Sequence, residues 1–297
     1  MTETEIGAIR MILAASPRPP DLAGRRERLD QVFGQFPLAA GARAEPVNAN
    51  GVPAEWTSTP AADPSRVILY LHGGGYASGS IASHRSMVSE LGLAAGARTL
   101  ALGYRLAPEA PFPAACDDVM TGYRYLLDGG IEPRRIVLAG DSAGGGLVMA
   151  TLLSLRDSSA PMPAGGFVIS PWVDLENTGA SMTEKDAVDP MIRKPYLDEL
   201  AGLYLGGADP RSPRASPLRA ELRGLPPLLV QVGTAETLLD DGTRLAARAA
   251  AADVRVTLSA WPEMIHVWHL FHPRLADARA AIAEAGAWMK AAGGPSS

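Results

Sequence analysis

A serine in a glycine-rich turn is the residue of this chain best suited to do chemistry. Ser142 lies in the sequence GDSAGG at residues 140–145, between the apolar run RIVLA and the helix-compatible run LVMATLL. In this context a G-x-S-x-G pattern places the serine on a sharp strand-to-helix turn, where small neighbours let the backbone pass closely. With 31 glycines in the chain the pattern alone is weak, so the prediction of a nucleophilic serine depends on this context and on partner residues.

A serine nucleophile needs an adjacent base, and the base needs a carboxylate that orients it. Where a serine occupies such a turn, the partners follow in the chain order serine, acid, histidine. This order leaves His266, His269 and His272 as candidates for the base. We favour His266, because it comes first after the last predicted strand, in a loop from which its imidazole could reach Ser142. The other two fall inside or beside the next helix.

Three carboxylates compete for the role of the acid. Glu236 comes three residues after the apolar run LLVQVG at residues 228–233, so we expect it in a loop at the carboxyl edge of the sheet. Asp240 and Asp241 come a turn later. In the first turn of a helix, carboxylates complement the helix dipole and need no catalytic role. We therefore favour Glu236.

Consecutive glycines directly after another apolar run predict an oxyanion hole. The sequence HGGG occupies residues 72–75, behind VILYL. Backbone N–H donors must approach the developing negative charge without side chains in the way. We expect Gly73, Gly74 and Ala143 to supply them, and His72 to be a structural residue of the loop. A phosphate-binding loop is disfavoured, since neither a G-x-G-x-x-G nor a Walker pattern occurs there.

Short apolar runs alternate with helical patterns, which indicates a parallel sheet covered by helices on both faces. Residues 41–57 are expected to add an antiparallel strand or two. Residues 1–40 and an insertion at 176–224 break the alternation, and we expect both to fold over the ligand site at the strand ends. Residues 41–297 would then form the catalytic domain. The predicted strands are 67–72, 99–104, 136–140, 166–171, 228–233 and 254–259, and the predicted helices lie near 83–96, 114–127, 143–156, 196–205, 237–252 and 274–291.

Taken together, the motifs resemble those of the bacterial hormone-sensitive lipase family, the family IV esterases of the α/β-hydrolase superfamily. The resemblance follows one order over the greater part of the chain and ends at His266. The family's D-P-L-x-D segment falls on ETLLD at residues 236–240, which puts Glu236 where an aspartate is commoner. The matching motifs are HGGGY (72–76), YRLAPE (104–109), PFPA (111–114), DD (117–118), GDSAGG (140–145) and SPWVDL (170–175).

The resemblance implies an α/β-hydrolase fold with a mostly parallel eight-stranded sheet, helices on both faces and a helical cap. It implies a carboxylesterase that hydrolyses short- to medium-chain acyl esters through an acyl-enzyme, with Ser142, His266 and Glu236 as the triad. It further implies no metal and no organic cofactor, and dimers are frequent in the family. The YRLAPE motif would support the oxyanion loop rather than touch substrate.

Composition argues against nucleic-acid and membrane partners, and the resemblance implies a small-molecule ester as the substrate. A net charge of −5 argues against nucleic acid, whose binding depends on Lys and Arg. No apolar run approaches the length of a membrane span and no signal peptide is evident, so we expect a cytoplasmic protein. The single cysteine, Cys116, excludes an intrachain disulfide and is expected to be a small buried residue.

Two further expectations concern the pocket and the chemistry. We expect Trp172 and Trp268 to line the acyl pocket together with the cap. Two alternatives remain beside simple ester hydrolysis: a ligand receptor of the same fold, and an enzyme for lactones, carbamates or amides. The presence of serine, glutamate and histidine disfavours the receptor. Comparing matched anilide and phenyl-ester substrates separates amide from ester cleavage.

Overall fold

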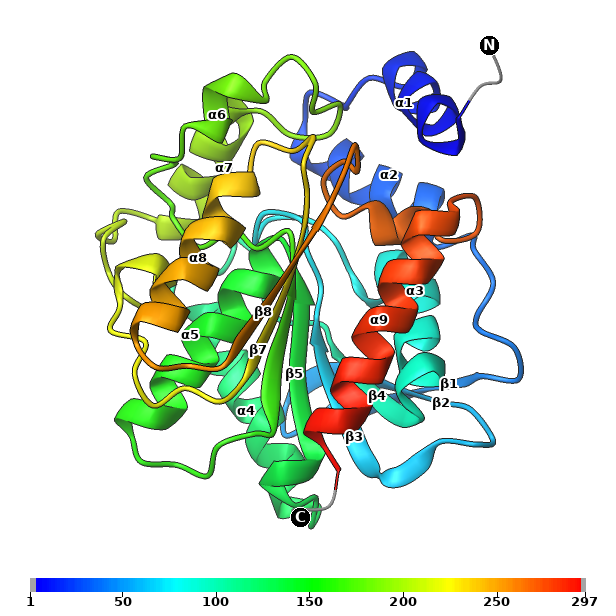
Figure 1. Ribbon diagram of the computed structural model, residues 1–297, viewed down its shortest axis with the longest axis vertical. Coiled ribbons are helices and arrows are strands. Elements are labelled where there is room, and N and C mark those ends of the chain that lie inside the picture. Colours follow the sequence, from blue (N-terminus) through cyan, green and yellow to red (C-terminus); the bar gives the residue numbers. More distant parts are fainter. Residues whose placement is uncertain (1–3, 295–297) are drawn as a thin grey trace.

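The computed structural model describes residues 4–294, and its centre is an eight-stranded sheet in the order β1-β2-β4-β3-β5-β6-β7-β8 (Figure 1). β2 pairs antiparallel with both β1 and β4, and every other pairing is parallel. The predicted mostly parallel sheet is therefore confirmed. The strands are β1 (Arg43–Ala49), β2 (Val52–Ser58), β3 (Asp63–Leu71), β4 (Ala97–Leu102), β5 (Ile136–Asp141), β6 (Gly165–Ile169), β7 (Leu228–Gly233) and β8 (Val256–Trp261).

Two strands lie about two residues from their predicted positions because a partner sets their register. β4, expected at 99–104, ends at Leu102, which pairs with Leu71, the last residue of β3. β8, expected at 254–259, ends at Trp261 opposite Gly233, the last residue of β7. A strand can extend only as far as its neighbour offers backbone partners.

Helices cover both faces of the sheet, as predicted. Along β3 the side chains alternate between two hydrophobic clusters, with Leu69 in one and Ile68 in the other. This alternation follows from the two-residue period of a strand. One cluster contains α4 (Ala114–Asp128), α5 (Ala143–Asp157) and α8 (Leu239–Ala251), and the other contains α3 (Ile81–Ala95) and α9 (Ala276–Ala292) (Figure 1). Short 3₁₀ helices occupy Pro133–Arg135, Pro217–Arg219 and Trp268–Phe271.

Four helices stand outside the strand–helix alternation, at the end of the sheet where the parallel strands finish (Figure 1). They are α1 (Glu5–Ala15) and α2 (Leu22–Phe33) from the N-terminal segment, and α6 (Ser181–Glu184) and α7 (Lys194–Leu205) from the insertion. Arg25 of α2 forms an ion pair with Glu199 of α7 at 2.8 Å. The two segments that break the sequence pattern are thus in contact with each other.

Two further findings concern expectations from composition. Cys116 is buried, with its Sγ 3.5 Å from the Tyr204 hydroxyl, as expected for a small core residue. Within residues 4–294, no helix combines the length and the apolar character that crossing a membrane requires.

Candidate active site

Ser142 occupies a strained turn between β5 and α5. It has a φ of 53° and a ψ of −119°, a backbone conformation that non-glycine residues rarely adopt and that marks functional turns. The Ser142 N–H donates to the Ile169 carbonyl at 2.8 Å, which ties the turn to β6. A Cβ on Gly144 would lie 1.9 Å from the Leu71 carbonyl oxygen, so only glycine lets the turn approach β3 this closely.

The structure brings Ser142, His266 and Glu236 into one hydrogen-bonded chain. His266 Nε2 lies 3.0 Å from Ser142 Oγ, and His266 Nδ1 lies 2.9 Å from Glu236 Oε2. The other Glu236 oxygen accepts from the Gly233 N–H at 3.0 Å. Glu236 is fully buried and the other two side chains nearly so. A histidine held in this way can accept a proton from the serine hydroxyl.

The two other candidate histidines bind elsewhere. His269 Nε2 lies 2.8 Å from Gln231 Oε1, and His272 Nε2 lies 3.0 Å from Ser86 Oγ. Burial lowers the pKa of His269 to about 3 and that of His272 to about 4, so both stay neutral near pH 7. Both are structural residues between the sheet and the outer helices.

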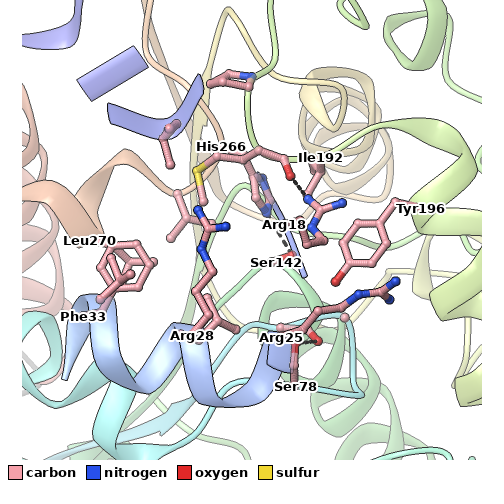
Figure 2. Close-up of a pocket in the computed structure, with 18 of the residues that line it drawn as sticks. Arg18, Arg25, Arg28, Phe33, Ser78, Ser142, Ile192, Tyr196, His266 and Leu270 are labelled. Atoms are coloured by element: carbon pink, nitrogen blue, oxygen red, sulfur yellow. Dashed lines mark hydrogen bonds between the residues drawn. The ribbon is translucent and has the colours of Figure 1, made fainter. Parts of the chain in front are cut away.

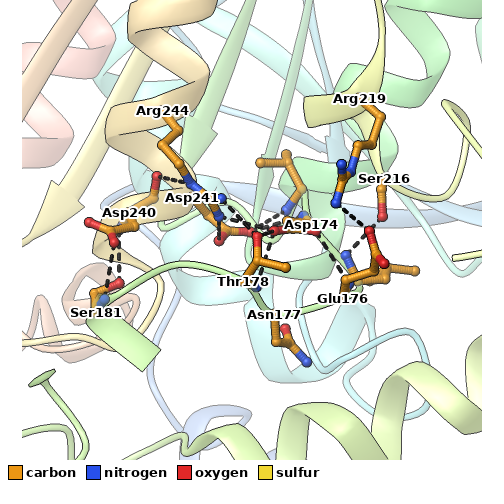
Figure 3. Close-up of polar contacts among 12 residues, drawn as sticks. Asp174, Glu176, Asn177, Thr178, Ser181, Ser216, Arg219, Asp240, Asp241 and Arg244 are labelled. Atoms are coloured by element: carbon orange, nitrogen blue, oxygen red, sulfur yellow. Dashed lines mark hydrogen bonds and ion pairs between the residues drawn. The ribbon is translucent and has the colours of Figure 1, made fainter. Parts of the chain in front are cut away.

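The two competing carboxylates bind backbone groups instead of a histidine (Figure 3). Asp240 Oδ2 accepts from the Ser181 N–H at 3.0 Å. Asp241 Oδ2 accepts from the N–H groups of Val173 and Asp174 at 2.9 and 3.0 Å. Asp240 thus ties the insertion to α8, and Asp241 ties the loop after β6 to α8.

His266 is tuned toward a stronger base. Burial lowers the pKa of His266, but the hydrogen bond and charge of Glu236 raise it, and the charges of Asp189 and Asp141 raise it further. The net result is a pKa above the ordinary value of 6.5. A base with a pKa near the working pH transfers protons most effectively.

One predicted oxyanion donor is wrong. The Gly73 N–H donates to Asp141 Oδ1 at 3.0 Å, so it is already bonded and Gly73 does not line the pocket. Gly74 and Gly75 do line the pocket, and within residues 4–294 their N–H groups form no hydrogen bond. Ala143 is the first residue of α5, where an N–H has no partner inside the helix. The available donors are therefore Gly74, Gly75 and Ala143.

Asp141, which our sequence reasoning did not single out, holds the oxyanion loop against the turn. Its Oδ1 accepts from the Tyr70 hydroxyl at 2.7 Å as well as from Gly73. Its Oδ2 lies 3.3 Å from His84 Nε2. The only signal for Asp141 in the sequence was its position, as a carboxylate directly before the candidate nucleophile.

His72 and Tyr104 support the same loop, as the sequence suggested. The Tyr104 hydroxyl donates to the His72 carbonyl at 2.7 Å, and the two rings stack at 4.3 Å. Burial, with the neighbouring His84, lowers the pKa of His72 to about 4, so His72 is a neutral structural residue.

Asp189, in the insertion, is the second functional candidate that the sequence did not indicate. Its Oδ2 accepts from the Thr237 N–H at 2.8 Å, next to Glu236. Its Oδ1 accepts from the N–H groups of Met191 and Ile192 at 2.8 and 3.0 Å. Asp189 is almost completely buried, and its hydrogen bonds connect the insertion to the loop that carries Glu236.

A pocket of about 230 Å³ opens at Ser142 and His266 (Figure 2). Its walls come from the N-terminal segment, the insertion and the glycine loop. Neither Trp172 nor Trp268 lines it, so the prediction that they contact substrate was wrong. Both are fully buried: the Trp172 indole N–H donates to Asn177 Oδ1 at 2.9 Å, and Trp268 packs against Trp261. Among residues 4–294, no three His, Cys, Asp or Glu side chains are grouped so that they could hold a metal ion.

Comparisons with known proteins agree on one family. A family model described as alpha/beta hydrolase fold matches residues 68–270. The chain is 48% identical over 268 residues to an acetyl-hydrolase of Streptomyces hygroscopicus, covering 90% of this chain and 88% of the relative. It is 34% identical over 260 residues to an esterase of Acinetobacter venetianus, covering 87% and 86%. The crystal structure of an esterase from the bacterial hormone-sensitive lipase family superposes with a TM-score of 0.93 at 49% identity, covering 98% of this chain and 97% of that one.

Proposed function

Since the chain belongs to the alpha/beta hydrolase fold family, in its bacterial hormone-sensitive lipase group, and is therefore a carboxylesterase, we propose that it cleaves short- to medium-chain acyl esters through Ser142, His266 and Glu236. One observation carries this proposal. Hydrogen-bond distances of 3.0 and 2.9 Å join the serine to the histidine and the histidine to the glutamate. The same arrangement of nucleophile, base and orienting acid supports acyl transfer on unrelated folds.

The first step forms the acyl-enzyme. Ser142 Oγ attacks the ester carbonyl carbon while His266 Nε2 takes the hydroxyl proton. Glu236 accepts the hydrogen bond from His266 Nδ1 and stabilises the imidazolium that results. His266 then gives its proton to the departing alkoxide, so the alcohol leaves and the acyl group remains on Ser142. In the second step a water attacks the acyl carbon by the same proton transfers, and the carboxylic acid is released.

Three backbone donors would stabilise the negative charge that develops on the carbonyl oxygen. Gly74 and Gly75 line the pocket with N–H groups that form no hydrogen bond within residues 4–294, and the N–H of Ala143, directly after Ser142, has no partner inside α5. A single donor of this kind typically contributes about 2.7–4 kcal/mol to the transition state. A Cβ on Gly74 would lie 2.2 Å from the Ser78 carbonyl oxygen, and its φ of 116° also requires glycine.

The size of the pocket supports short acyl chains. Its volume of about 230 Å³ lies below the roughly 300–1,000 Å³ of sites for drug-sized ligands. A relative that covers most of this chain is named an acetyl-hydrolase. We therefore include acetyl and butyryl esters among the best substrates.

We also propose a division of the chain into a cap and a catalytic domain. Residues 1–40 and the insertion at about 176–224 would form the cap, and residues 41–297 the catalytic domain that holds the insertion. The contact between Arg25 and Glu199 supports a single cap made from both segments. Residues 1–3 and 295–297 lie outside the described part of the chain.

Hydrolysis of p-nitrophenyl acetate, butyrate, octanoate and palmitate by the wild type and Ser142→Ala tests the proposal. We expect rates to fall beyond octanoate, and the substitution to leave only the roughly 10³–10⁴-fold acceleration over water that remains without a triad member. A folded Ser142→Ala protein that keeps a large fraction of wild-type activity would contradict the role of Ser142. A folded wild type that is inactive on every chain length would contradict simple ester hydrolysis and favour lactones, carbamates or amides as substrates.

A further inference from the structure

Three arginines line the candidate active-site pocket. Arg18 lies in the segment between α1 and α2, and Arg25 and Arg28 lie on α2. In Figure 2 the side chains of Arg28 and Arg18 lie on opposite sides of the Ser142–His266 pair, whereas the Arg25 guanidinium turns away from it. This concentration of positive charge contrasts with the net charge of −5 of the whole chain.

The charge of Arg25 is already compensated. Its guanidinium forms an ion pair with Glu199 at 2.8 Å and donates to the carbonyl oxygens of Pro19 and Pro20 at 3.0 and 2.7 Å. Arg25 therefore holds α2, α7 and the connecting segment together, and a substrate would gain little from its charge.

Arg18 and Arg28 are bonded differently. Arg18 donates to the Met191 carbonyl, and its guanidinium lies 3.5 Å from the centre of the Tyr196 ring. Arg28 donates to the carbonyl oxygens of residues 16 and 17. Within residues 4–294 neither arginine forms an ion pair with a carboxylate. Burial lowers the pKa of Arg18, as do the positive charges of Arg25 and Arg28, whereas Tyr196 and Asp189 raise it, and the net direction is down.

We infer that this pocket takes esters that carry an anionic group, a carboxylate or a phosphate, which Arg18 and Arg28 bind. A guanidinium has five N–H donors, and the bonds to carbonyl oxygens use only one or two of them. The remaining donors match the oxygens of a carboxylate or phosphate in a charge-assisted pair. The inference rests on the proposed function, because it names the substrate class of the same site.

Pairs of esters of similar size, one with an anionic group and one neutral, test the inference. Mono-p-nitrophenyl glutarate against p-nitrophenyl valerate places the charge on the acyl side. On the alcohol side, p-acetoxybenzoate and p-acetoxyphenyl phosphate, each against methyl p-acetoxybenzoate, distinguish a carboxylate from a phosphate. We first subtract the rate of each ester without enzyme, which for the glutarate includes attack by its own carboxylate, and then correct for hydroxide-catalysed reactivity. We expect a higher kcat/KM for the anionic ester on at least one side. The preference should weaken with added salt, which screens charges.

Arg18→Gln and Arg28→Gln should each lower the anionic-to-neutral ratio of kcat/KM by about tenfold, the effect of losing one charge-assisted hydrogen bond. Arg124→Gln is the matched control, because Arg124 is exposed on α4 and does not line the pocket. The ratio separates the two roles of these arginines, since a purely structural change in the 16–20 segment would slow both esters alike.

Inhibition of the wild type gives a second measurement that needs no variant. Benzoate should inhibit p-nitrophenyl acetate hydrolysis competitively and at lower concentration than benzamide. The inference is overturned if neutral esters are hydrolysed normally, anionic esters show no preference on either side, and benzoate is no better than benzamide. It is also overturned if a preference exists but survives both arginine substitutions. Ester hydrolysis that persists in Ser142→Ala would instead contradict the proposed function.

Discussion

Replacing Glu236 by glutamine tests which carboxylate orients His266. In the wild type the two Glu236 oxygens accept from separate donors, the Gly233 N–H at 3.0 Å and the His266 Nδ1–H at 2.9 Å. Glutamine keeps the volume of this fully buried side chain, but it has a single carbonyl oxygen for the two donors. If the amide NH₂ faces Nδ1, the imidazole proton moves to Nε2, which can then no longer accept the proton of Ser142. Such a wrong tautomer lowers kcat by about 10⁴-fold, or about 5 kcal/mol in the barrier.

Initial rates with saturating p-nitrophenyl acetate measure this loss, and circular dichroism during heating verifies that the variant is folded. Asp240→Asn is the matched control, because Asp240 is the next carboxylate along the chain and its Oδ2 binds the Ser181 N–H at 3.0 Å. Its loss should cost about 1 kcal/mol of stability, and kcat should change by less than about tenfold.

The opposite ranking would refute the reasoning. A folded Glu236→Gln protein that keeps more than about a tenth of wild-type kcat has no tautomer problem. Coupled with a large loss in Asp240→Asn, that result would move the acid from Glu236 to Asp240. The hydrogen bond to His266 would then be structural.

The geometry leads to four more expected outcomes. Neutral His266 is the base, and its pKa is raised above 6.5. The value of kcat/KM should therefore be at its maximum above that pKa and fall as the pH drops through it. A pH–rate profile should show a midpoint above 6.5. Asp189→Asn removes a charge that raises the pKa of His266, so it should move this midpoint down, lower kcat by about tenfold, and cost about 1–3 kcal/mol in urea unfolding. Gly144→Ala should cost about 3 kcal/mol or prevent folding because its Cβ would lie 1.9 Å from the Leu71 carbonyl oxygen. Circular dichroism during heating measures this loss. In the same assay Gly202→Ala should stabilise α7 slightly, because its Cβ meets no atom within 4 Å.

Much of the fold was predictable because local patterns specify it. Continuous apolar runs become central strands. The run at 136–140, for example, lies in β5, which is buried along its whole length. The ends of strands were less predictable. β4 stops at Leu102 because β3 stops at Leu71, and this pairing joins residues distant in sequence.

The pocket was the least predictable part of the site. Trp172 was predicted to line the acyl pocket, yet it is fully buried, because a large apolar ring gains more from the core than from a pocket. The arginines that do line the pocket belong to an N-terminal segment outside the alternation of strands and helices. Nothing local indicates that Arg18 and Arg28 line the same pocket as the glycine loop.

The sequence by itself determined the alternation of strands and helices, the turn that exposes Ser142, and the order in which acid and base follow it. Each depends on residues close together in the chain. Tertiary structure alone decided that Gly73 binds Asp141 while Gly75 faces the pocket, and that Asp189 reaches the loop of Glu236. These contacts join segments that meet only when the sheet and its outer helices pack, and packing depends on the shape of the whole chain rather than on any local pattern.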